Sequence, residues 1–116
     1  MEITANELKA LLGEAGQPIT ATLETSDQTG PWQIGKPYLI RTVTQTLTGC
    51  LCAVHEHELV LTDAAWIGDT ERWATAVADG AFREVEPFPD GTPVIVGRGA
   101  IIDAVAVTWP LPRMQK

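Results

Sequence analysis

Four side chains that can bind soft metal ions lie close together in this sequence, in the pattern Cys50-x-Cys52-x-x-His55-x-His57. Thiolate and imidazole groups are common ligands of zinc in proteins. The spacing nevertheless differs from the Cys-x-x-Cys type of pair found in structural zinc sites. Cys50 and Cys52 are two residues apart on a predicted strand, so their side chains face the same side. We interpret them as small apolar side chains and the two histidines as part of a polar turn. We expect no bound metal ion.

The sequence offers few groups for other kinds of catalysis. Ser26 is the only serine, it lies in a segment rich in glycine and proline, and no local pattern places a histidine beside it. Glu84 and Glu86 share a predicted strand face and could act as acid and base, but a solvated strand face explains them more simply. Residues 97–99, Gly-Arg-Gly, lack the further glycine and the following helix of a dinucleotide site. We expect a protein that is not an enzyme, with no cofactor and no catalytic residue.

The net charge bears on the partners of the protein. Its 116 residues include 15 acidic and 8 basic ones, which gives a formal net charge of −7. Binding to nucleic acid depends on clustered Lys and Arg, so we expect no direct contact with DNA or RNA. The acidic residues are spread along the chain, which indicates either a solvated surface or an acidic patch for a basic partner.

Two features argue against a membrane-bound or secreted protein. No apolar run reaches the roughly 18 residues of a membrane-spanning helix, and the longest run near the C-terminus, residues 100–107, is interrupted by Asp103. The first residues, MEITANELKALLG, carry Glu2 in place of the basic start of a signal peptide. We expect a cytosolic protein without membrane contact.

The elements that would position these side chains fall into two parts. A capping-box pattern followed by a leucine stripe predicts a short helix over residues 5–12. A weakly alternating stretch among glycines and prolines, residues 19–23, suits an edge strand. We therefore divide the chain into an N-terminal helix and arm, residues 1–35, and a β-rich core domain, residues 36–116.

The core domain alternates between apolar and polar positions in a way that predicts several short strands. The polar residues 55–58 are expected to form a hairpin loop and residues 97–99 a bulge or turn. A helix is expected to begin at Asp69 or Thr70 and to end at Gly80. The expected strands cover residues 38–45, 50–54, 59–61, 82–86, 94–96 and 101–109. Because most links are too short for helical crossovers, we predict an α+β domain, mainly antiparallel β, built as a small barrel or sandwich with two short helices.

Candidate contact residues lie in three places outside the expected hairpins. The chain has four tryptophans, and tryptophan and arginine carry a large share of the energy of protein interfaces. One group lies in the arm, one arginine lies between two glycines, and one group lies in the tail, where prolines stop a sheet ladder. The predicted partner-binding residues are Trp32, Ile34, Arg98, Trp109 and Arg113.

From Lys36 onward the chain shows an ordered set of motifs: an IRT strand, a strand begun by a glycine, ELVLTDAAWIGDT, the acidic turn VEPFPDG, GRGAIIDA and a Leu-Pro-Arg end. In this order they resemble a family of small phage and prophage proteins whose domain has no assigned function. The resemblance extends from Lys36 to Lys116 and does not include the N-terminal helix and arm. It implies a viral origin, and it implies no reaction and no catalytic residues.

These observations lead to two main hypotheses of function. The first is a non-enzymatic bacteriophage structural or assembly protein, accessory to the capsid or tail, which acts through protein contacts as a homo-oligomer in the virion or the host cytoplasm. The second is a phage inhibitor of host defence, either an acidic protein binder or a sponge for a small nucleotide held by Arg41, Arg98 and a stacking tryptophan. A third, a metal-dependent enzyme built on the Cys and His pattern, predicts stoichiometric metal in the purified protein.

Overall fold

Residues 30–116 are the part of the chain that the computed structural model describes. The chain divides after Pro31, and the elements below all belong to the unit Trp32–Lys116. The helix expected over residues 5–12 and the strand expected over residues 19–23 lie outside the described residues.

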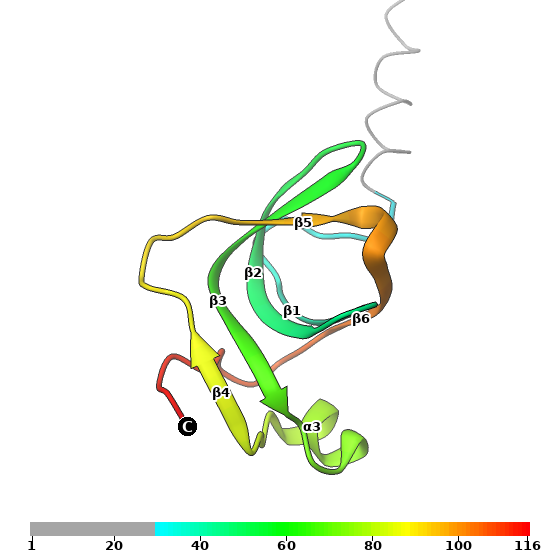
Figure 1. Cartoon of the computed structure of the whole chain (residues 1–116). Coiled ribbons are helices and arrows are strands. Elements are labelled where there is room, and N and C mark those ends of the chain that lie inside the picture. The colour runs from blue at the N-terminus through cyan, green and yellow to red at the C-terminus, as the bar shows by residue number, and fades with distance from the viewer. Residues whose placement is uncertain (1–29) are drawn as a thin grey trace, which may run out of the picture. The chain divides into compact units, whose positions relative to one another are not determined.

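The described residues form one antiparallel sheet, a short α-helix and a 3-10 turn (Figure 1). The strand order is β4-β3-β2-β1-β6, and β5 pairs with β3 beside this path. The elements in chain order are β1 (Pro37–Thr42), β2 (Thr46–Val54), β3 (Glu58–Asp69), α3 (Trp73–Asp79), β4 (Glu84–Pro87), β5 (Val94–Gly97), η2 (Arg98–Ala100) and β6 (Ile101–Ala106). The predicted mainly antiparallel β architecture is confirmed.

The longest strand, β3, organises the sheet. One edge of β3 pairs with β2, and the other edge pairs with two different strands. Residues 58–61 pair with β5, and residues 65–69 pair with β4. Figure 1 shows β3 running down through the body, with β4 beside its lower part. The helix α3 forms part of the connection from β3 to β4, so it lies at the far end of β3 from the β2–β3 hairpin.

A kink where β2 meets β3 lets the sheet bend. The pairing slips between Thr48 and Cys50, and on the opposite strand Asp63 has a φ of 50°. A Cβ atom at Gly49 would lie 3.0 Å from the Cβ of Leu61, so a larger residue would push the two strands apart. Gly49 therefore lies at a kink inside β2 and does not start this strand.

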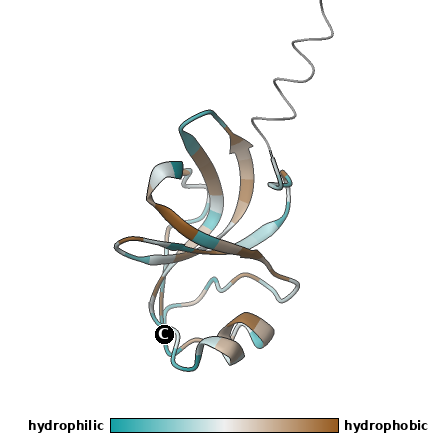
Figure 2. Ribbon diagram, turned by 90° about the vertical axis from the view of Figure 1, so that its right-hand side faces the viewer, coloured by the Kyte–Doolittle hydropathy of each residue, from teal (hydrophilic) through white to brown (hydrophobic). Residues whose placement is uncertain are grey.

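The sheet carries a hydrophobic core on each of two faces. Alternate residues of β1 belong to different cores, because neighbouring strand residues face opposite sides. The first core contains Tyr38, Ile40, Leu47, Leu51, Leu59, Leu61, Ala64 and Val96. The second contains Leu39, Ala65, Ile67, Ala76, Phe82, Val85, Val107 and Trp109. Figure 2 shows hydrophobic segments along the strands and a hydrophilic tip on the hairpin between β2 and β3.

The helix α3 covers the second core, but the expected start at Asp69 or Thr70 is wrong, because β3 continues to Asp69 and the helix begins at Trp73. Its buried residue is Ala76, and Trp73 and Val77 pack against the same core. The helix ends at Gly80, which has a φ of 68° and donates its N–H to the carbonyl of Ala76 at 2.9 Å. No helix within residues 30–116 is long and apolar enough to cross a membrane.

The expected barrel is not supported, because the sheet is not closed. Within the described residues β5 pairs only with β3 and β6 pairs only with β1, so no ladder joins β5 to β6. The count of two helices is not confirmed either. The helical elements described are α3 and the three-residue turn η2, and the expected N-terminal helix lies outside the described residues.

Several strand ends differ from the predicted ones. β1 stops at Thr42 and not at residue 45, because the Thr42 hydroxyl accepts hydrogen bonds from the N–H groups of Thr44 and Gln45 and turns the chain. β3 continues to Asp69, which makes Trp66 a strand residue. β2 begins earlier than predicted and β6 ends earlier.

Candidate functional site

The tail after β6 is bound to the body by Trp109. The Trp109 side chain is 9% exposed, and its ring packs edge-on against Phe82 with the ring centroids 5.5 Å apart. Its Nε1–H donates to the carbonyl of Val77 at 2.9 Å, near the end of α3. A buried indole with its N–H satisfied is a structural residue, so Trp109 joins the tail to the helix in this chain.

Arg113 continues this attachment. Its Nη1 donates to the carbonyl of Ala64 and its Nη2 to the carbonyl of Phe88, both at 2.9 Å, and Nη2 also pairs with the Asp90 carboxylate at 2.7 Å. A guanidinium fork can bind several acceptors in one plane. Arg113 therefore fastens the tail to β3 and to the turn after β4.

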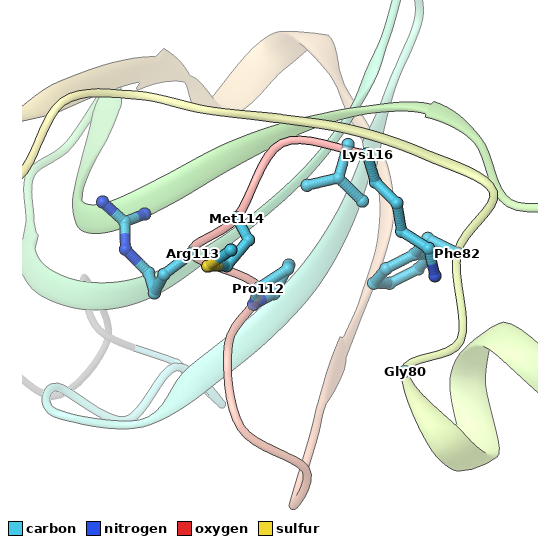
Figure 3. Close-up of a pocket in the computed structure, with 7 residues that line it drawn as sticks. Gly80, Phe82, Pro112, Arg113, Met114 and Lys116 are labelled. Carbon is cyan, nitrogen blue, oxygen red and sulfur yellow. The ribbon is translucent and has the colours of Figure 1, made fainter.

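A small open pocket of about 200 Å³ lies beside the tail. It is lined by Gly80, Phe82, Val85, Pro112, Arg113, Met114 and Lys116. Figure 3 shows the guanidinium of Arg113 directed away from Phe82 and Lys116. Pockets that enclose drug-sized ligands usually measure roughly 300–1,000 Å³, so we interpret this one as the groove between the tail and the second core.

Arg98 is bonded to the β2–β3 hairpin. Its Nη1 donates to the carbonyl of His55 at 2.7 Å, and its backbone N–H donates to the carbonyl of His57 at 2.9 Å. The residue begins the turn η2, so the predicted break at residues 97–99 is a 3-10 turn. The arginine thus connects the turn before β6 to the hairpin.

Trp32 and Ile34 differ in exposure although they are close in sequence. Trp32 packs against the first core, with its ring 5.0 Å from that of Tyr38, centroid to centroid. The segment is held by the N–H of Gly35, which donates to the carbonyl of Leu51 at 2.7 Å. Ile34 remains 61% exposed. Because Trp32 and Trp109 belong to opposite cores, the five predicted contact residues do not form one surface.

The cysteine and histidine pattern of β2 and its hairpin does not converge on one point. Cys50 is half-buried, and Cys52, His55 and His57 are exposed. Within residues 30–116 no group of three His, Cys, Asp or Glu side chains is placed to hold a metal ion.

An arginine, a tryptophan and a carboxylate meet beside the second core, on the face of β1 to which Leu39 also points. The guanidinium carbon of Arg41 lies 4.6 Å from the centroid of the Trp73 ring, a cation–π contact. The same guanidinium forms a two-point pair with Asp103, whose Oδ1 accepts from Nε at 2.9 Å. The hydrogen bond from Arg41 holds the pKa of Asp103 below its ordinary value, and the same bond raises the pKa of Arg41. Sequence reasoning considered Arg41 only as a nucleotide contact and did not foresee this pair.

Trp66 on β3 is a second tryptophan with carboxylates nearby, and these carboxylates belong to β4. The sequence patterns did not single it out. Trp66 is 38% exposed and is paired across the strands with Glu86. It points away from the second core, because Ala65 and Ile67 on either side of it belong to that core. The alternation of the sequence around Trp66 was the signal that could have revealed its outward direction, had the predicted strand been extended beyond residue 61.

Comparisons of the chain with protein-family models, with curated proteins and with solved structures gave no match.

Proposed function

We propose that this chain is a non-enzymatic bacteriophage structural or assembly protein that acts through protein–protein contacts, as a homo-oligomer and with other particle proteins. The observation that carries the proposal is the open edge of β5. This strand pairs only with β3 among the described residues, and Ile95 in its middle is 70% exposed. Unpaired strand edges with apolar side chains are ready sites for strand addition from another chain.

The register of the β3–β5 pair identifies the groups at this edge. Arg98 donates its N–H to the carbonyl of His57, so these two residues form a hydrogen-bonded pair. Along an antiparallel ladder such pairs alternate with pairs that exchange no hydrogen bonds. Ile95 and Gly97 therefore fall at the positions whose own N–H and C=O groups point away from β3. A second copy of the chain could pair with these groups, which supports the homo-oligomer.

The phage part of the proposal is supported by the sequence motifs from Lys36 onward. Their resemblance to small phage and prophage proteins favours a location in the virion or in the cytoplasm of the host. Such a protein should remain attached to purified particles. Mass spectrometry of washed particles tests this: we expect the chain in a fixed ratio to the other particle proteins, and its complete absence would overturn the proposal.

A phage inhibitor of host defence is the second candidate, and the surface around Trp66 favours its acidic-binder form over the nucleotide sponge. The sponge would need Arg41 and Arg98 to bind phosphate, but Arg41 is paired with Asp103 and Arg98 donates to a hairpin carbonyl. Calorimetry against a panel of signalling nucleotides separates the two forms, since a sponge must give saturable binding and a protein binder must give none.

A further inference from the structure

We propose that the outer surface formed by Trp66, Glu84 and Glu86, here called the Trp66 face, binds an arginine side chain of a protein partner. This inference rests on the proposed function, in which the chain acts through protein contacts, and it names the chemistry of the partner. Nucleic acid and anionic lipid surfaces are disfavoured occupants, because both would be repelled by the carboxylates and by the net charge of −7.

The side chains of the Trp66 face converge over Gly68. A Cβ atom at Gly68 would lie 2.7 Å from the Glu84 carboxylate and 2.9 Å from Cη2 of Trp66. The carboxylate and the edge of the indole therefore meet above the bare backbone of this glycine. Glu86 stands directly across from Trp66 on β4, on the same side of the sheet. The glycine thus leaves room for the indole to lie beside two carboxylates.

The carboxylates of the Trp66 face lack a cationic partner within residues 30–116. Both glutamates are exposed. The contact recorded for Glu86 is with the amide of Gln115, whose Nε2 donates at 3.4 Å, and none of the ion pairs of the described residues includes either glutamate. An aromatic ring and two unneutralised carboxylates on one sheet face are complementary to a cation.

The molecule itself shows how an arginine fits such a set of groups. Arg41 lies over the ring of Trp73 at 4.6 Å and is held by two hydrogen bonds to the carboxylate of Asp103. The Trp66 face presents the same groups, an indole and carboxylates, but its arginine is not supplied by the described chain. Arginine is favoured over lysine because its planar guanidinium stacks on a ring while it binds a carboxylate through two N–H groups.

The experiment uses the full-length chain and a capped peptide with arginines at alternate positions, acetyl-GRGRG-amide. Two-dimensional NMR resolves the indole N–H signals of the four tryptophans, and Trp66→Phe identifies the signal of Trp66. We expect this signal to shift saturably with the arginine peptide, less with acetyl-GKGKG-amide, and not with acetyl-GEGEG-amide. A titration in which the Trp66 signal stays in place would overturn the proposal.

Matched charge variants separate the Trp66 face from general attraction to an acidic protein. The double variant Glu84→Gln/Glu86→Gln should weaken binding of the arginine peptide about five-fold or more, because it removes two charge pairs at a partly exposed site. Glu56→Gln with Glu58→Gln removes the same charge from exposed residues of the β2–β3 hairpin and should change binding less than about two-fold. Equal weakening by both double variants would overturn the site.

Failure of this inference can be told apart from failure of the proposed function. If the peptide does not bind although washed particles contain the chain, the Trp66 face is wrong and the proposed function stands. If the peptide binds as expected but the chain is absent from particles, the arginine site stands and the virion proposal fails.

Discussion

Two buried threonines on neighbouring strands differ in what their hydroxyl groups contact. Thr42 closes the turn after β1: its Oγ1 accepts from two backbone N–H groups and donates to the carbonyl of Gln45 at 3.0 Å. Thr48 on β2 is fully buried, and its Oγ1 has no hydrogen-bond partner in the described structure. A hydroxyl buried without a partner costs free energy of folding, whereas a satisfied one stabilises the fold.

The same substitution should therefore have opposite effects at the two sites. Thr48→Val removes an unsatisfied hydroxyl at nearly constant volume and should leave the free energy of unfolding unchanged or raise it by up to about 1 kcal/mol. Thr42→Val removes the acceptor of two N–H groups, which belong to exposed residues, and should lower it by roughly 0.5–1.5 kcal/mol. Urea unfolding of both variants measures the difference, and a Thr48→Val variant as unstable as Thr42→Val would contradict this description.

The Arg41–Asp103 pair predicts a specific dependence of stability on pH. Because the folded protein holds the pKa of Asp103 below its ordinary value of about 3.9, the unfolded chain takes up the proton first as the pH falls. The stabilisation is therefore fully present above pH ~5 and is lost as the pH falls through the lowered pKa. The thermal midpoint of the protein should exceed that of Asp103→Asn at neutral pH, and this difference should shrink in acid.

A double-mutant cycle assigns that effect to the pair. The free energies of unfolding of Arg41→Gln, Asp103→Asn and the combined variant give a coupling free energy between the two side chains. It should be favourable at pH 7 and close to zero at a pH below the pKa of Asp103 in both the folded and the unfolded chain. A coupling that does not change with pH would show that the charge of Asp103 is not responsible.

At the scale of elements, the end of α3 depends on a close approach of Gly80 to the tail. A Cβ atom at Gly80 would lie 2.4 Å from Cδ2 of Trp109, and the φ of 68° is already unfavourable for other residues. Gly80→Ala should lower the free energy of unfolding by about 2–4 kcal/mol, the sum of left-handed strain and overpacking.

Gly91 offers a matched control for this prediction. It also has a positive φ, of 80°, but a Cβ atom there would meet nothing within 4 Å. Gly91→Ala should therefore cost only the conformational part, about 1–2 kcal/mol. Chemical denaturation of both variants separates the two contributions, and equal losses would mean that the contact with Trp109 contributes little.

The elements themselves were largely predictable, because their signals are local. Alternation located β1, the polar residues 55–58 located the hairpin, and the spacing of apolar residues before Gly80 located α3. The extension of β3 past residue 61 was not predicted, since its second half gains pairing from β4, which is distant in sequence. Local patterns do not contain that partner.

The candidate contact residues were harder to predict for the same reason. Trp109 and Arg113 have the residue types of interface anchors, but in the folded chain they are used to attach the tail to Val77, Ala64 and Phe88. The residue type shows what a side chain can bind, and only the fold shows whether an internal partner already occupies it. The outward direction of Trp66 follows from strand alternation and could have been predicted. Its neighbours Glu84 and Glu86 come from a different strand, so their position beside Trp66 could not be predicted from local patterns.

At the scale of the whole molecule, the open edge of β5 predicts how copies associate. Ile95→Lys places a charge at the centre of that edge, where Ile95 is 70% exposed, so folding should be little affected and self-association should weaken. Sedimentation equilibrium of the full chain measures the association. Val43→Lys is the matched control, because Val43 is 69% exposed and lies outside β5. Self-association that Ile95→Lys leaves intact would exclude this edge.

We propose that the chain works by contacts with other proteins in a phage particle. The most direct measurement is its copy number per particle, determined by mass spectrometry with isotope-labelled standards through successive washes. We expect a copy number that stays constant from wash to wash and from preparation to preparation. Particles that contain none of the chain, while the infected cells contain it in quantity, would rule out a role in the particle.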